Sequence, residues 1–110
     1  MVTLIKNLGN STIYITQYQE KNYKKLSINS LMAPNYVYLS AYNEDKTIAF
    51  SLEFRFAKLD PHPAAKRAAL RKLAYYLKKI LKQRKCQEYH FYTDIYNITD
   101  INIVRRYLER

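Results

Sequence analysis

A chain of 110 residues and 13.2 kDa has the length of one domain with a single hydrophobic core. Apolar residues form 48% of the chain and charged residues 25%, which excludes wholesale disorder. The single glycine excludes a glycine-rich phosphate loop and a dinucleotide-binding fingerprint, and the single cysteine excludes an internal disulfide. We therefore expect a folded protein that is stabilised by packing.

The first half of the chain has the patterns of two β-hairpins. Residues 2–8 and 11–18 read as strands on either side of Gly9-Asn10. Residues 36–42 and 47–57 alternate apolar and polar side chains around a turn at 43–46, and 47–57 has the cleanest two-residue period in the chain.

The segment between these hairpins, residues 19–35, has no sustained period. Pro34 also disfavours helix at the residue before it. We expect a connection that contains a short helix or an edge strand.

Residues 64–85 contain no helix breaker and follow prolines at 61 and 63, which predicts one long helix. After it, residues 89–96 read as a strand, and Thr99 or Asp100 is suited to cap a short C-terminal helix. At about 100° per residue, one side of the long helix is apolar and the opposite side is basic. The apolar stripe comprises Ala69, Leu70, Leu73, Leu77, Ile80 and Leu81.

Together these elements predict an α+β domain, because strands come in runs and are followed by helices. We expect an antiparallel sheet of four to five strands, with the long basic helix and the short C-terminal helix packed on one face. Strand 47–57 should form the core of the sheet and pack Phe50, Leu52, Phe54 and Phe56 against the helix stripe.

The net charge of +10 is concentrated in one stretch. Residues 61–87 hold nine basic and no acidic residues, whereas the rest of the chain holds ten basic and nine acidic residues. A clustered excess favours a local electrostatic function over general solubility.

Nucleic acid is the partner that matches such a surface, because basic side chains that neutralise phosphates release condensed counterions. A helix of this length spans about one turn of duplex, which favours double-stranded DNA. Tyr75 projects from the middle of the basic side, where it could stack on a base or hydrogen-bond a phosphate. The alternative is a solvated helix face. The candidate contact residues are Arg67, Arg71, Lys72, Tyr75, Lys78, Lys79, Lys82 and Lys85.

The chain has twelve tyrosines, and five of them share strand faces with polar residues. Such a face could stack single-stranded nucleic acid, form an interface with a second copy or another protein, or simply pack within the fold. An interaction protein that uses this face is therefore the alternative function. The five residues are Tyr14, Tyr18, Tyr36, Tyr38 and Tyr42.

No constellation predicts an enzyme. Tyr75 and Lys78 have the Tyr-x-x-Lys spacing of rolling-circle replication initiators, but the paired histidines that hold the metal in those enzymes are absent. The acidic residues Glu53, Asp60 and Asp94 do not form a diagnostic metal motif. We expect no catalytic residues, metal, cofactor or small-molecule substrate.

The small size, the richness in Tyr, Ile and Lys, and the basic segment AAKRAALRKLAYYLKKILKQRK resemble the small proteins encoded by filamentous viruses of the Sulfolobales. The resemblance is one of composition over the whole chain. It implies DNA binding or interference with host defences. No apolar run reaches the roughly 18 residues of a membrane span, and residues 1–6 lack the layout of a secretion signal, so we expect an intracellular protein.

Overall fold

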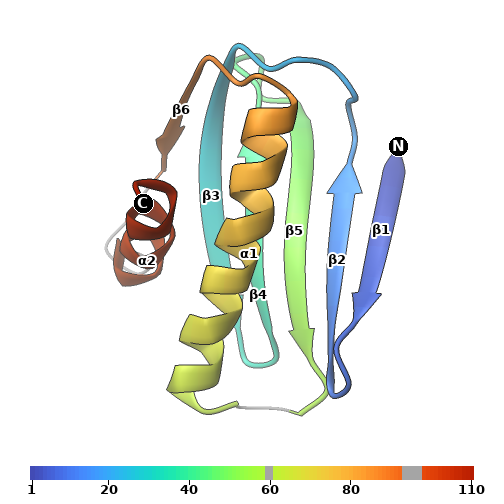
Figure 1. Ribbon diagram of the computed structural model, residues 1–110, viewed down its shortest axis with the longest axis vertical. Coiled ribbons are helices and arrows are strands. Elements are labelled where there is room, and N and C mark those ends of the chain that lie inside the picture. Colours follow the sequence, from blue (N-terminus) through green and yellow to red (C-terminus); the bar gives the residue numbers. More distant parts are fainter. Residues whose placement is uncertain (59–60, 93–97) are drawn as a thin grey trace.

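One mixed sheet, covered on a single face by helices, makes up the fold (Figure 1). The computed structural model describes residues 1–58, 61–92 and 98–110. In this part of the chain there are six strands, in the order β1-β2-β5-β4-β3-β6, and two helices. The strands are β1 (Val2–Asn7), β2 (Ser11–Gln17), β3 (Lys25–Ala33), β4 (Tyr36–Tyr42), β5 (Ile48–Phe56) and β6 (Glu88–Phe91). The helices are α1 (Pro63–Gln83) and α2 (Ile98–Leu108).

Both predicted hairpins are present. β1 pairs with β2 across a turn in which Gly9 has a φ of 71°, a left-handed conformation that favours glycine. β4 pairs with β5 across a turn closed by a hydrogen bond from the Asn43 N–H to the Thr47 carbonyl. Each turn contains typical turn residues between two segments in which apolar and polar side chains alternate, and this local pattern is why the sequence alone located both turns.

The prediction that residues 19–35 form a connection is wrong over most of its second half, because residues 25–33 form the strand β3. This strand is not at an edge: it lies between β4 and β6. Ser30 interrupts the apolar series on the helix-facing side, and Leu31 places a large apolar residue on the opposite side, where it is exposed. These two residues conceal the two-residue period, and Pro34 lies in the tight turn to β4.

The expectation of an antiparallel sheet with four to five strands also needs correction, because the sheet has a sixth strand and β6 runs parallel to β3. The cause is α1. It follows β5 and carries the chain back along the length of the sheet, so the next strand starts at the same end as β5 and runs in the same direction. β6 begins at Glu88, one residue before the predicted strand 89–96, and overlaps it at residues 89–91, while residues 93–97 lie outside the described part of the chain.

The long helix begins at Pro63, one residue before the predicted start, and ends two residues before the predicted end. His62 caps it: its imidazole Nδ1 accepts a hydrogen bond of 3.0 Å from the Ala64 N–H. This satisfies one of the free N–H groups of the first turn. The shorter helix α2 begins at Ile98, so the predicted caps Thr99 and Asp100 lie inside its first turn.

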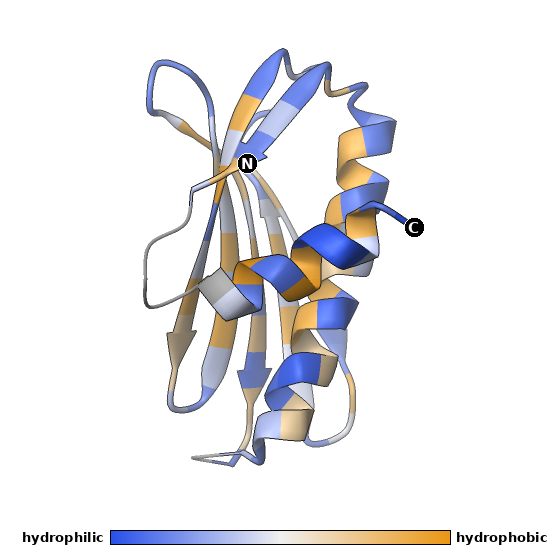
Figure 2. Cartoon of the chain, turned by 90° about the vertical axis from the view of Figure 1, so that its left-hand side faces the viewer, coloured by the Kyte–Doolittle hydropathy of each residue, from blue (hydrophilic) through white to orange (hydrophobic). Residues whose placement is uncertain are grey.

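The hydrophobic core lies between the sheet and α1. All four predicted β5 residues, Phe50, Leu52, Phe54 and Phe56, are buried in it. Figure 2 shows the apolar and polar residues of α1 recurring at helical spacing, with both helices on one side of the sheet. The buried residues of α1 are the predicted stripe with the addition of Ala74. The α+β class is therefore confirmed. None of the described helices is long and apolar enough to cross a membrane.

The core assignment predicts that Phe54→Asp unfolds the domain. The Phe54 side chain is only 8% exposed, so the variant loses a packed ring and must place a carboxylate among apolar side chains. We expect a loss of at least about 4 kcal/mol in the free energy of unfolding. Urea denaturation followed by circular dichroism measures it. Leu31→Asp is the matched control, because Leu31 is 54% exposed on the opposite sheet face. Equal stability of the two variants would contradict the assignment.

Candidate nucleic-acid interface

The outer side of α1 presents a row of basic side chains, as the sequence predicts. All seven predicted cations are exposed. Arg67, Arg71, Lys78 and Lys82 follow one another at helical spacing along α1, while Lys85 comes just after the helix end. The two other basic residues of the segment, Lys66 and Arg84, are half-buried. Arg84 turns to the sheet and donates hydrogen bonds of 3.1 and 3.2 Å to the Gln17 side-chain oxygen.

Tyr75 lies at the centre of this row and is 44% exposed. Four basic residues surround it on the helix surface, because Arg71, Lys72, Lys78 and Lys79 are three or four positions away. The Lys79 Nζ lies 5.2 Å from the centroid of the Tyr75 ring, which is within the range of a cation–π contact. The one predicted aromatic contact is thus embedded in positive charge.

Carboxylates of the described residues do not neutralise this surface. Among those residues, the ion pairs are Lys25 with Glu88, Arg55 with Glu53, and Arg84 with Glu20. None of them involves the seven exposed cations on and just beyond α1. Asp100 lies close enough to Lys66 for the lysine charge to lower its pKa, but burial raises that pKa more strongly. Cations that no carboxylate neutralises are available to a polyanion.

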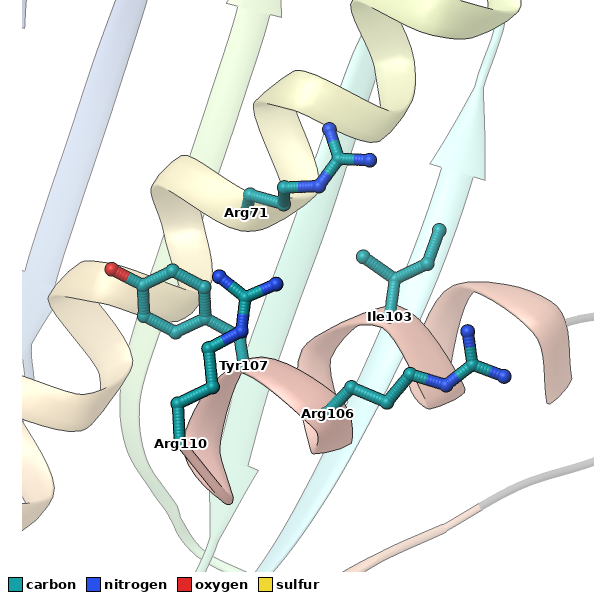
Figure 3. A pocket seen from close by; sticks show the side chains of 5 residues that line it. All are labelled: Arg71, Ile103, Arg106, Tyr107 and Arg110. Atoms are coloured by element: carbon teal, nitrogen blue, oxygen red, sulfur yellow. The ribbon is translucent and has the colours of Figure 1, made fainter.

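A second group of cations, which the sequence analysis missed, comes from α2. Figure 3 shows three arginines around a hollow of about 130 Å³ between the helices, Arg71 from α1 and Arg106 and Arg110 from the C-terminal residues. Ile103 and Tyr107 complete its lining. The Lys78 Nζ donates a hydrogen bond of 2.9 Å to the Arg110 carbonyl, which fastens the end of the chain to α1. Residues 98–110 contain three arginines, and the packing of α2 beside α1 brings two of them, Arg106 and Arg110, to the basic row, whereas Arg105 lies over the Phe91 ring.

The predicted tyrosine face is the sheet face that no described helix covers. The pairing registers place Glu53 of β5 between Tyr14 of β2 and Tyr38 of β4, opposite the core face. Tyr18 is 40% exposed, and the other four predicted tyrosines are half-buried. Burial raises the pKa of the Tyr38 phenol, partly offset by a hydrogen bond with Ser51. A shallow hollow of about 350 Å³ lies over these strands. The face exists as predicted, and no contact in the described part of the chain assigns it a partner.

The residues considered for catalysis do not come together in the described part of the chain. Glu53 pairs with Arg55 at 3.2 Å on the tyrosine face, and no cluster of possible metal ligands is found among the described residues. Asp60 and Asp94 lie outside them. Burial raises the pKa of the Cys86 thiol, which opposes formation of a nucleophilic thiolate.

Comparison with known proteins adds no assignment: no family model, no curated protein and no solved structure matches this chain. The site must therefore be interpreted from its own geometry.

The arginine cluster predicts that salt stabilises the fold. Arg71, Arg106 and Arg110 line one hollow, neither aspartate nor glutamate is among its lining residues, and salt screens the repulsion between the arginines. Arg106→Gln should raise the melting temperature in about 0.01 M salt, where the Debye length is about 30 Å, and have little effect in about 1 M salt, where it is about 3 Å. Lys58→Gln removes the same charge from an exposed residue outside the hollow. An equal shift in both variants would attribute the effect to net charge alone.

Proposed function

We propose that this protein binds nucleic acid without catalysing a reaction, with duplex DNA favoured, through phosphate contacts from α1 and α2. The observation that carries the proposal is the row of seven exposed cations on and just beyond α1, none of which forms an ion pair with an aspartate or glutamate among the described residues. A polyanion would replace their mutual repulsion by attraction and release its own counterions.

The shape of the row favours a stiff duplex. With 21 residues, α1 is about 32 Å long at about 1.5 Å per residue, close to the roughly 34 Å of one duplex turn. The sheet holds the helix along its apolar side, so the charges keep fixed positions. A fixed, straight row of cations is best matched by a partner whose phosphates are also held at regular spacing.

The hollow between the helices supplies a different kind of contact. Arg71, Arg106 and Arg110 line it, and guanidinium groups bind phosphate oxygens through paired, charge-assisted hydrogen bonds. A phosphate seated there would meet arginine side chains from both helices, whereas the rest of the row provides contacts from α1 alone. The hollow is therefore the expected anchor of the bound backbone.

Removing cations from the row should weaken binding in a salt-dependent way. We choose Arg71→Ala, Lys72→Ala and Lys82→Ala together, because Lys78 fastens the end of the chain and Lys79 contacts Tyr75. The slope of log K against log salt should become shallower by about 0.9 for each phosphate that the variant no longer neutralises. Fluorescence anisotropy with duplex DNA over a salt series measures it.

The matched control removes three exposed lysines from loops, Lys21, Lys24 and Lys46, and so has the same net charge. It should keep the wild-type slope. Failure of the wild type to bind duplex DNA at about 50 mM salt, or an equal reduction of the slope in the control, would falsify the proposal.

Tyr75→Ala should lower affinity but leave the salt slope nearly unchanged, because neither stacking nor a neutral hydrogen bond releases counterions. Tyr75→Phe separates the two roles of the side chain: it keeps the ring and removes the hydroxyl. Retained affinity in the phenylalanine variant indicates stacking, and reduced affinity indicates a hydroxyl–phosphate hydrogen bond. Comparison of duplex DNA, single-stranded DNA and RNA identifies the preferred form. A changed slope in both variants would contradict this role.

The open tyrosine face supports a second candidate function, that of an interaction protein. Its five tyrosines lie on the side of the sheet away from both helices. Tyrosine is common at interfaces because one side chain provides both apolar area and a hydroxyl. A protein partner bound there would leave the basic row of α1 free.

A further inference from the structure

The edge strand β1 is unusually apolar for a strand with a free side. All six of its residues are exposed. Val2, Leu4 and Ile5 are 46%, 50% and 55% exposed, and Leu4 and Ile5 lie on opposite faces of the sheet. Apolar surface therefore borders the free edge on both faces.

Natural sheets protect such edges with prolines, bulges, clustered charges or short strands. β1 has none of these: it pairs with β2 in an unbroken register, lacks proline and carries Lys6 as its only charge. The opposite edge differs. There β6 is only four residues long and carries Glu88 and His90. The unprotected edge of the described sheet is thus confined to β1.

The backbone of β1 also has groups free to pair. The Leu8 N–H donates to the Ser11 carbonyl at 2.8 Å, so even-numbered residues of β1 direct their backbone groups to β2. The same alternation holds next to β2, which lies between β1 and β5: the Tyr18 N–H donates to the Ala49 carbonyl, so even-numbered residues of that segment direct their backbone groups to β5 and odd-numbered residues direct theirs to β1. Thr3, Ile5 and Asn7 therefore direct their N–H and carbonyl groups to the free edge.

We propose that a second copy of this chain pairs with β1, antiparallel and related by a two-fold axis at Leu4. Leu4 then faces Leu4 of the second copy, and Thr3 faces Ile5 of the second copy. The two sheets become one, and the tyrosine faces of both copies lie on the same side. A second copy fits this edge because the strand is complementary to itself in sequence and in hydrogen bonding.

Charge selects this register over the neighbouring one centred on Ile5. At about 3.4 Å per residue, an axis at Leu4 separates the two Lys6 residues by about 14 Å, whereas an axis at Ile5 brings them to about 8 Å. The Debye length at physiological salt is about 8 Å, so the register centred on Leu4 avoids most of the repulsion between the two Lys6 side chains. The Lys6 Nζ also lies 5.2 Å from the Tyr76 ring centroid, on the helix side of the sheet.

The high net charge does not oppose this pairing locally. β2 has no charged residue, so Lys6 is the only charge in the two strands nearest the interface. The basic row lies on the outer side of α1, which packs mainly against β4 and β5. The cationic surfaces of the two copies therefore stay apart on the same side of the joined sheet.

The oligomeric state tests the proposal without nucleic acid, so its outcome is independent of the proposed function. Sedimentation and light scattering over a concentration series should give twice the chain mass of 13.2 kDa for the wild type. Leu4→Lys places two lysines opposite each other and should be monomeric. Leu31→Lys changes an equally exposed leucine on β3 and should stay dimeric, as should Tyr38→Ala combined with Tyr42→Ala. Circular dichroism verifies that each variant is folded.

A monomeric wild type overturns the proposal. So does a dimer that survives Leu4→Lys but dissociates in the tyrosine variant, which would assign the interface to the tyrosine face. The register has its own test in a Cys86→Ser background. Oxidation should cross-link Leu4→Cys but not Ile5→Cys, whose pairs are separated by about 8 Å, beyond the reach of a disulfide. The reverse result overturns the Leu4-centred register.

Discussion

The packing of the apolar stripe of α1 against β4 and β5 is the interaction on which the other features depend. A helix turns by about 100° per residue, so burying Leu70, Leu73 and Leu77 fixes the direction of every other side chain of α1. The cations must then face outward, and Tyr75 with them. The same packing forms the core and aims the candidate interface, and α2 docks beside α1 on that side of the sheet.

Electrostatics places a second constraint on the molecule. The exposed cations of α1 lie beside Arg106 and Arg110, and the ion pairs among the described residues involve Glu20, Glu53 and Glu88, away from these cations. Like charges held together raise the free energy of the isolated protein, and a bound polyanion lowers it. Stability and binding are therefore linked: conditions that screen the surface favour the fold and weaken the proposed attraction to phosphates at the same time.

Because both helices lie on one face, the sheet retains two surfaces of different chemistry. The tyrosine face is broad, and its serines are covered by neighbouring side chains: Ser40 and Ser51 are buried there although no described helix lies over them. The β1 edge is narrow, but it combines exposed apolar side chains with free backbone groups, a combination that favours pairing with another strand. The two surfaces are distinct from the basic row, so occupation of one leaves the others accessible.

Features that depend on residues close together in the chain can be predicted from the sequence alone. The two hairpins, the long helix, its buried stripe and its basic outer side all follow from periods of two or 3.6 residues and from local turn residues.

The remaining features of the fold and of the candidate site depend on tertiary contacts. β3 is recognisable only through its partners β4 and β6, because Ser30 and Leu31 break its period. Contacts between segments far apart in the chain set the parallel direction of β6 and bring Arg71, Arg106 and Arg110 to the rim of one hollow. The exposure of both faces of β1 reflects the absence of such contacts among the described residues. No local pattern encodes them, because the same strand or helix sequence is compatible with several neighbours until the whole core is assembled.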